Sequence, residues 1–328
     1  MAYTTIDNPE LYFQTKLYTG TGNSHAITLD GSENMQPDWV WIKCRDDSHN
    51  HQVFDSVRGV HKRMRTDTSG AETESSESLK SFNTDGFTLG TQANVNNSGN
   101  TFVAWNWKET ATAGFDIVSY TGNDSAGRTI SHSLSAVPKM MIVKCRNVGK
   151  EWTIFHASLG NGKFIELDNN SAVQTATNRW NDTSPTSSVF SVGVDSSVNA
   201  SGQTYIAYLF SEKKGYSKFG SYTGNGNADG AFVYTGFEPA FLLLKKTDSG
   251  TNWNMYDNKR SPFNKTDGLL RPDTSATEIN TDEFDFLSNG FKARNSAAAM
   301  NASGSPFIFM AFAENPFVTS TGVPATAR

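Results

Sequence analysis

Three blocks of sequence recur in this chain, always in the same order and at nearly constant spacing. The tripeptide Tyr-Thr-Gly begins at residues 18, 120 and 222. The strings "PDWVWIKCRD", "PKMMIVKCRN" and "PAFLLLKKTD" follow at Pro37, Pro138 and Pro239. A third block closes each unit as "NSGNTFVAWNWKE", "NASGQTYIAYLFSE" or "NASGSPFIFMAFAE", and we align Ala104, Ala207 and Ala311 within it. Self-similarity at a fixed period indicates a repeated structural unit, so any fold for this chain has to be built from three related parts.

The repeats divide the chain into five segments. They are an N-terminal arm (1–13), repeat 1 (14–110), repeat 2 (115–214), repeat 3 (215–318) and a C-terminal tail (319–328). The linkers between repeats are short and polar, so we expect the three units to lie close together. The composition of both terminal segments is typical of extended arms, and we expect these to order against a neighbouring subunit.

Each repeat shows a pattern of about seven short strands separated by turns rich in Asn, Ser and Gly. Aromatic residues make up 12% of the chain and suit pleated strands. We therefore predict an all-β fold of three tandem homologous β-sandwich domains of about 100 residues each. The segment "TYIAYLF" (204–210) is apolar on both faces, which predicts a central strand covered on both sides. A charge at Ile206 or Tyr208 should then unfold the unit.

Composition excludes several classes of protein. The net charge of −5 argues against a nucleic-acid-binding surface, which needs a basic footprint. The longest strongly apolar run, near 306–313, is too short to insert into a membrane. The N-terminus has neither the basic nor the apolar region of a signal peptide, and two cysteines cannot form a disulfide framework. We expect a protein that folds in a cytoplasm.

The stretch "DDSHNHQVFD" (46–55) looks like a metal site because it holds His49 and His51 beside aspartates. Aligning the repeats places His51 where Trp152 and Trp253 stand, and places His49 in the variable loop before the strand. A stable zinc site usually needs three or four ligands. We therefore interpret this stretch as a loop and a strand, and leave open a metal that bridges His49 and His51 within an assembly. The candidate contact loop comprises Asp46, Asp47, Ser48 and His49.

Two further series of polar residues recur once in every repeat. They are Lys43, Lys144 and Lys245, and Asp55, His156 and Asp257. Three equivalent copies argue for a repeated hydrogen bond or ion pair at a strand end and not for proton chemistry. Cys44 and Cys145 share one slot and are best interpreted as small core residues. We predict no catalytic residue, no cofactor and no metal ligand, and thus no enzyme.

Several strings resemble a family of β-rich proteins encoded by marine bacteriophages, cyanophages among them. The strings are "QPDWVWIKCRD", "FDSVRGV", "TDGFTLG", "FVAWNWK", "YSKFGSYTGNGNADGAFVYTGFEPAFLLLKKTDS" and "GVPATAR". The likeness runs over nearly the whole chain, and 216–249 is its most specific part. It implies a late-expressed structural protein of the virion and supplies no catalytic residues.

We weigh three hypotheses of function, of which the resemblance implies the first two. The first is a homo-oligomeric tail-fibre or tail-appendage protein, in which the arm (1–13) attaches to other virion proteins or copies of itself. Its distal loops would meet a glycan or protein on the host surface. The second is a capsid decoration protein, located in the virion like the first. The third is a carbohydrate-active enzyme, which would need paired carboxylates in a groove, and we identify no such pair.

Overall fold

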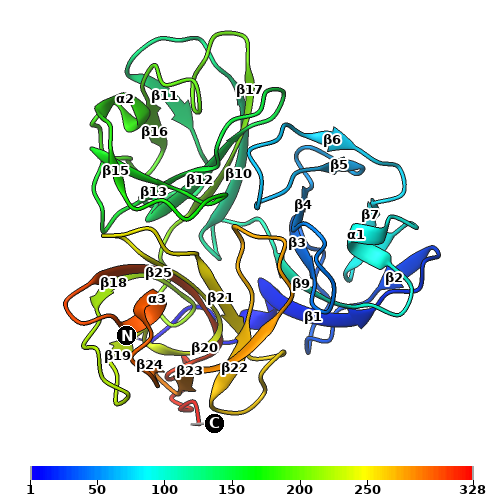
Figure 1. The fold of residues 1–328 in the computed structure, drawn as a ribbon, viewed down its shortest axis with the longest axis vertical. Helices are drawn as coiled ribbons and strands as arrows, with labels where there is room; N and C mark the ends of the chain where they lie inside the picture. Colours follow the sequence, from blue (N-terminus) through cyan, green and yellow to red (C-terminus); the bar gives the residue numbers. More distant parts are fainter. Residues whose placement is uncertain (1, 327–328) are drawn as a thin grey trace.

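The computed structural model describes residues 2–326, so Met1 and the last two residues of the expected tail lie outside the described part. The prediction of an all-β fold is confirmed: short antiparallel sheets make up the body, and the α-helices are single turns. Within residues 2–326 no helix has the length and apolar character needed to cross a bilayer. Figure 1 shows three lobes arranged around a common centre.

Repeat 1 forms a main sheet of strand order β1-β9-β3-β4 and a smaller sheet of order β2-β8-β7. The arm before it contains η1 (Pro9–Leu11). The elements of repeat 1 are β1 (Phe13–Thr19), β2 (His25–Ile27), β3 (Trp39–Cys44), β4 (Gln52–Asp55), β5 (Lys62–Arg63), β6 (Thr73–Glu74), β7 (Leu79–Phe82), β8 (Phe87–Leu89), α1 (Ala93–Asn96) and β9 (Thr101–Trp107). The strand β9 is central in the main sheet because it pairs with both β1 and β3.

Repeats 2 and 3 contain main sheets of the same order, β10-β17-β12-β13 (extended by β14 and β15) and β18-β25-β20-β21. Repeat 2 comprises β10 (Phe115–Thr121), β11 (Arg128–Ser131), β12 (Met140–Cys145), β13 (Thr153–His156), β14 (Lys163–Glu166), β15 (Gln174–Thr175), α2 (Thr177–Trp180), β16 (Val189–Val192) and β17 (Thr204–Phe210). Repeat 3 comprises β18 (Ser217–Thr223), β19 (Phe232–Tyr234), β20 (Phe237–Lys246), β21 (Asn254–Asp257), β22 (Thr266–Leu269), β23 (Ile279–Leu287), β24 (Gly290–Ala293), α3 (Ala298–Asn301) and β25 (Pro306–Pro316).

The three main sheets share one central core. One face of each sheet packs inside its own repeat, while the other face contributes to a single apolar cluster that includes Trp39, Tyr208 and Phe312. Every residue from Tyr205 to Phe210 is fully buried. The expectation that this strand is covered on both sides is confirmed, and the second cover comes from the other two repeats. The repeats therefore form one body around a shared core.

Strand register corrects one position of the sequence alignment. Lys43, Lys144 and Lys245 pair with Val103, Ile206 and Ile308, so the next position along is Ala104, Ala207 and Phe309. Ala311 therefore lies two residues beyond the place that the alignment gave it. The larger ring of Phe309 fits because Gly220 lies opposite: a Cβ on Gly220 would stand 2.8 Å from the ring.

The recurring Tyr-Thr-Gly motif has a structural explanation. In repeat 2 the Tyr120 hydroxyl donates to the Val198 carbonyl at 2.7 Å. A Cβ on Gly122 would lie only 2.1 Å from the Ala200 carbonyl oxygen, so no side chain fits there. The fully buried Asn199 accepts from the backbone N–H of Asn123 at 3.0 Å and fixes the turn after the motif. The same three contacts recur around Asn96 and Asn301.

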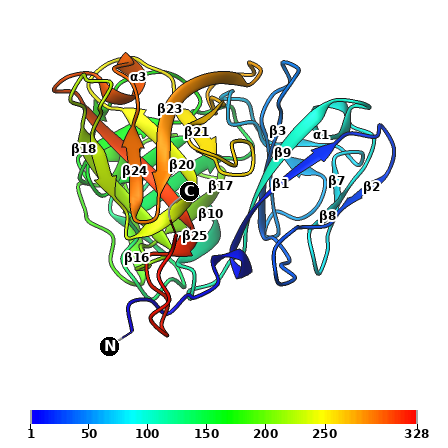
Figure 2. The same ribbon diagram turned by 90° about the horizontal axis from the view of Figure 1, so that it is seen from below.

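The N-terminal arm packs on repeat 3 of its own chain, where we had expected a neighbouring subunit. The Tyr3 hydroxyl donates to the Gly236 carbonyl at 2.8 Å, and Thr4 Oγ1 donates to the Lys214 carbonyl at 2.8 Å. Ile6 is buried in the shared core. The C-terminal tail meets the arm where the Ser320 N–H donates to Asp7 at 2.6 Å. Figure 2 shows the N-terminus and the red C-terminal segment on the same side of the molecule, opposite α3.

Candidate contact loop and repeat junctions

The candidate contact loop connects β3 to β4, and its first residue has a structural role. The Asp46 carboxylate accepts hydrogen bonds from Asn100 Nδ2 and from the N–H and hydroxyl of Thr101, each at 2.9 Å. Partial burial acts to raise the pKa of Asp46, but these hydrogen bonds outweigh it and bring the pKa to about 2. Asp46 therefore fastens the loop to the start of β9.

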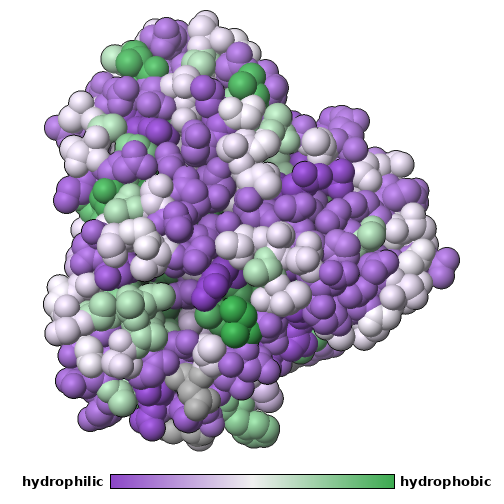
Figure 3. Space-filling view, in the orientation of Figure 1, coloured by the Kyte–Doolittle hydropathy of each residue, from purple (hydrophilic) through white to green (hydrophobic). Residues whose placement is uncertain are grey.

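The loop is accessible from Asp46, which is itself exposed, through the next three residues. Asp47 and Ser48 are exposed and His49 is half-buried. Asp47 accepts from the Ser48 N–H at 2.7 Å, and one of its carboxylate oxygens lies 3.6 Å from His49 Nε2. The face of the molecule in Figure 3 is mainly hydrophilic with small apolar spots. A partner of this face would meet polar groups and small apolar contacts.

His51 joins repeat 1 to repeat 3. Its Nδ1 accepts from Trp41 Nε1 at 2.9 Å, and its Nε2 donates to the Arg271 carbonyl at 3.0 Å. Burial lowers the pKa of this imidazole well below its usual value, so the ring is neutral at pH 7. Both ring nitrogens are occupied, which leaves His51 no nitrogen for a metal. Within residues 2–326 no three His, Cys, Asp or Glu side chains are grouped to hold a metal ion.

The tryptophans that occupy the place of His51 make the same bond in the other repeats. Trp152 Nε1 donates to the Arg65 carbonyl and Trp253 Nε1 donates to the Glu166 carbonyl, each at 2.8 Å. Repeat 2 thus donates to repeat 1, repeat 3 to repeat 2, and repeat 1 to repeat 3. The three hydrogen bonds thus form a closed ring of contacts among the repeats. In this ring the imidazole N–H of His51 takes the place of the indole N–H that Trp152 and Trp253 donate.

The recurring lysines also hold loops in place. Lys144 Nζ donates to the Ser69 carbonyl of repeat 1 at 2.8 Å, and Lys245 Nζ donates to the Asn170 carbonyl of repeat 2 at 3.1 Å. Lys43 Nζ donates to the Asp47 carbonyl in its own loop at 3.3 Å. Burial lowers the pKa of all three lysines to about 8. These contacts agree with the interpretation of a repeated structural hydrogen bond.

An ionic network crosses the junction between repeats 1 and 2. The buried Asp55 pairs with Arg58 and accepts from the Tyr208 hydroxyl of repeat 2 at 2.6 Å. Arg58 also lies 3.0 Å from Glu72, which in turn binds Arg146 of repeat 2 at 3.0 Å. Every charge is paired, which is the condition under which buried ions are tolerated.

The junction between repeats 3 and 1 contains the same network. Asp257 pairs with Arg260 at 2.5 Å and accepts from Trp105 Nε1 of repeat 1 at 2.9 Å. Arg260 lies 3.1 Å from Glu278, and Glu278 binds Arg45 of repeat 1 at 2.7 Å. Burial acts to raise the pKa of Glu278, but its two arginines outweigh burial and lower it.

The junction between repeats 2 and 3 replaces all five positions with neutral groups. The aspartate of the other junctions is replaced by His156 and the arginine that it pairs with by Leu159. The glutamate is replaced by Val173, its second arginine by Thr247, and the Trp or Tyr donor by Met310. The backbone bond persists, since the Val173 N–H donates to the Thr247 carbonyl at 3.0 Å, and His156 Nε2 contacts the Phe309 carbonyl at 3.2 Å. An aspartate here would be buried without Arg or a donor, so these positions change together.

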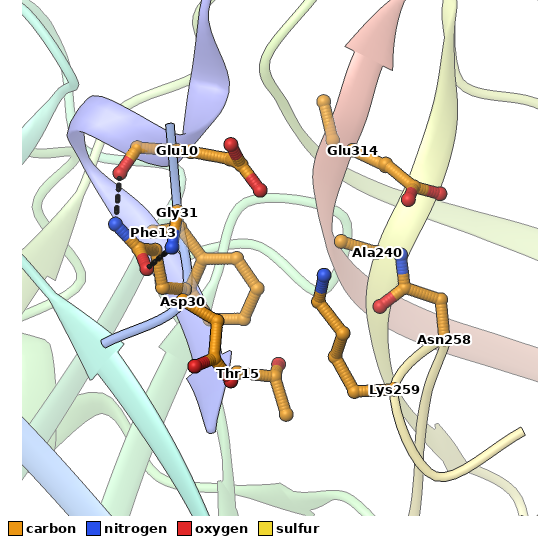
Figure 4. Close-up of a pocket in the computed structure, with 11 residues that line it drawn as sticks. Glu10, Phe13, Thr15, Asp30, Gly31, Ala240, Asn258, Lys259 and Glu314 are labelled. Atoms are coloured by element: carbon orange, nitrogen blue, oxygen red, sulfur yellow. Dashed lines mark hydrogen bonds between the residues drawn. The ribbon is translucent and has the colours of Figure 1, made fainter. Parts of the chain in front are cut away.

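A small hollow lies between repeats 1 and 3 (Figure 4). Carboxylates and a lysine surround it, and Thr15 Oγ1 and Asn258 Oδ1 at its wall have no hydrogen-bond partner within residues 2–326. It exists because Thr15 stands where Ile117 and Phe219 fill the core of the other repeats. Its volume of about 20 Å³ suits one water molecule and is too small for an organic substrate.

The fold and these contacts define an all-β protein in which three repeats are locked into one body. Comparison with known proteins assigns its family: the chain belongs to the family described as DUF7483, a domain of unknown function, whose model matches residues 8–316. That match spans all three repeats, so the family model describes the whole three-repeat body and not a single repeat. No curated protein matches the chain.

Proposed function

We propose that this protein is a structural component of a bacteriophage virion, as a tail-fibre or tail-appendage protein that binds other virion proteins or the host surface. The observation that carries the proposal is the way the three repeats interlock. A closed ring of three junction hydrogen bonds and a shared core hold the three repeats together. Such a body suits load-bearing assembly, and its loops remain available for contact.

The resemblance to phage proteins adds independent support, because it rests on segments of the amino-acid sequence and not on the contacts between the repeats. Capsid decoration is the second candidate. The repetition of strand order around a common centre favours it, because such a body presents three related surfaces to a threefold position of a shell. In both cases the protein acts by binding.

A map of purified particles tests this proposal. Density for a three-lobed body on the tail would support the fibre or appendage role, and density on capsid faces would replace it with decoration. Immunogold labelling of intact particles provides the same decision independently. Absence of the chain from washed particles, measured by mass spectrometry, would refute both roles. Release of oligosaccharides from host polysaccharide would instead support the carbohydrate-active enzyme.

A further inference from the structure

Repeat 3 differs from its two sisters in the aromatic side chains that it exposes. Among residues 2–326 the most exposed large apolar side chains are Phe263 (79%), Val323 (60%), Tyr234 (52%) and Phe232 (47%), all in repeat 3 or the tail behind it. Repeats 1 and 2 expose only valines to a comparable degree. The main sheets share one strand order, so this difference is not required by the fold.

Phe232 and Tyr234 lie side by side on the outer face of β19. Val233 between them points into the core, so the two rings point outward and their Cα atoms are about 7 Å apart. β19 is the edge strand of the sheet β19-β24-β23-β22, whose strands β23 and β24 stand toward the viewer in Figure 2. The equivalent positions are Ala26 and Thr28 in repeat 1, and Thr129 and Ser131 in repeat 2.

Both rings are held in position by contacts from neighbouring segments. A Cβ on Gly290 would lie 3.1 Å from Phe232 Cε2, so this ring rests directly on the glycine. The Tyr3 hydroxyl donates to the Gly236 carbonyl and therefore accepts from the Tyr234 hydroxyl, at 3.1 Å. The Tyr234 oxygen keeps its own acceptor lone pairs for a ligand. Rings fixed in advance lose little entropy when a ligand binds.

The charges around the rings are already paired. Lys292, opposite Phe232 on β24, pairs with Asp229, and Arg294 lies 3.3 Å from Asp285. A charged occupant would have to break these pairs, so the surface fits a neutral one. Two half-exposed rings offer roughly 200 Å² of contact. A stable protein interface needs about 800 Å² from each partner, which argues against a second copy of the chain.

We propose that Phe232 and Tyr234 form a stacking platform for a neutral saccharide. Two sugar rings in sequence would place their apolar C–H faces on the aromatic rings, and a sugar hydroxyl would donate to the Tyr234 oxygen. The inference concerns this surface alone and holds whether or not the chain is part of a virion. It also gives the arm a second role, because Tyr3 orients Tyr234.

Affinity electrophoresis of the full chain in gels that contain dextran, glucomannan, hydroxyethyl cellulose or anionic alginate tests this proposal. We expect retardation by at least one of the neutral polymers. Phe232→Ala and Tyr234→Ala should each weaken that binding by about ten-fold, and the double variant should abolish it. The control is Phe263→Ala, which removes the most exposed ring of the same repeat and should bind like the wild type.

Thermal denaturation of each variant shows whether it is folded, and both substitutions are at exposed positions that tolerate Thr, Ser or Ala in the sister repeats. Failure of all three neutral gels to retard the wild type would overturn the proposal. Unchanged retardation of the double variant would overturn it as well. So would a concentration-dependent dimer in sedimentation velocity that the double variant loses, because the platform would then bind a second copy.

Discussion

Replacing Arg58 by Leu tests whether the charged junctions act as linked units. The Arg58 guanidinium is fully buried and contacts Asp55, Glu72 and the Val53 carbonyl. Its removal leaves the buried Asp55 with the Tyr208 hydroxyl and one backbone N–H, without a counter-ion. Breaking a buried ion pair from one side costs about 3–5 kcal/mol. At roughly 2 °C per kcal/mol for a chain of this size, the melting temperature should fall by about 6–10 °C.

Repeat 2 supplies the compensating change. The double variant Asp55→His with Arg58→Leu reproduces the His156 and Leu159 pair and removes the unpaired carboxylate, so it should recover at least half of the lost free energy of unfolding. Chemical denaturation monitored by tryptophan fluorescence measures the values. Lys62→Leu is the control: its ion pair with Glu74 is at the surface, and its loss should cost less than about 1 kcal/mol. A double variant that is no more stable than Arg58→Leu would refute the reasoning.

Three further predictions concern the ring, the repeated turn and pH. His51→Phe should lower the free energy of unfolding by about 1–3 kcal/mol, because Trp41 Nε1 and the Arg271 carbonyl lose their partner; an unchanged melting curve would contradict the closing role of His51. Gly122→Ala should destabilise the chain by more than about 3 kcal/mol, because its Cβ would stand 2.1 Å from the Ala200 carbonyl oxygen. The control Gly149→Ala should change stability little, because its nearest contact is at 3.4 Å. Equal effects of the two substitutions would contradict this explanation of the Tyr-Thr-Gly motif. Burial raises the pKa of Asp273 in the folded protein to about 6, which is above its value in the unfolded chain. The contribution of this carboxyl group to stability is therefore lost as the pH rises from about 4 through 6. Asp273→Asn should therefore gain stability relative to the wild type between pH 4 and pH 7, by up to about 2–3 kcal/mol in paired thermal melts, and a pH-independent difference would argue against this shift.

Much of the fold was available in the sequence because it depends on local pattern. Short segments rich in aromatic residues, separated by turns rich in Asn, Ser and Gly, identified the strands, and the two-sided apolar run at 204–210 identified a strand covered on both faces. The sequence could not show which residues cover the second face of this strand, because they belong to the other two repeats, about 100 positions away in both directions. The error at Ala311 has a similar cause: only pairing with β20 shows that Phe309 takes that place.

The candidate site was predictable to a smaller extent. Alignment correctly placed His51 at a tryptophan position, but the carbonyl that it binds belongs to another repeat. The spacing Asp-x-x-Arg in repeats 1 and 3, against His-x-x-Leu in repeat 2, was a visible signal for the two charged junctions. Its meaning required knowing that Tyr208 and Trp105 face the aspartates. The arm was expected to order against a neighbouring subunit, because no local pattern shows that Ile6 enters the shared core of its own chain.

Differential scanning calorimetry of the intact chain tests the central claim most directly. If the three repeats share one core and a closed ring of junctions, they should unfold together in one transition. The van't Hoff enthalpy should then equal the calorimetric enthalpy. Three separable transitions, or a van't Hoff enthalpy near one third of the calorimetric value, would show that the repeats unfold independently and would contradict the account.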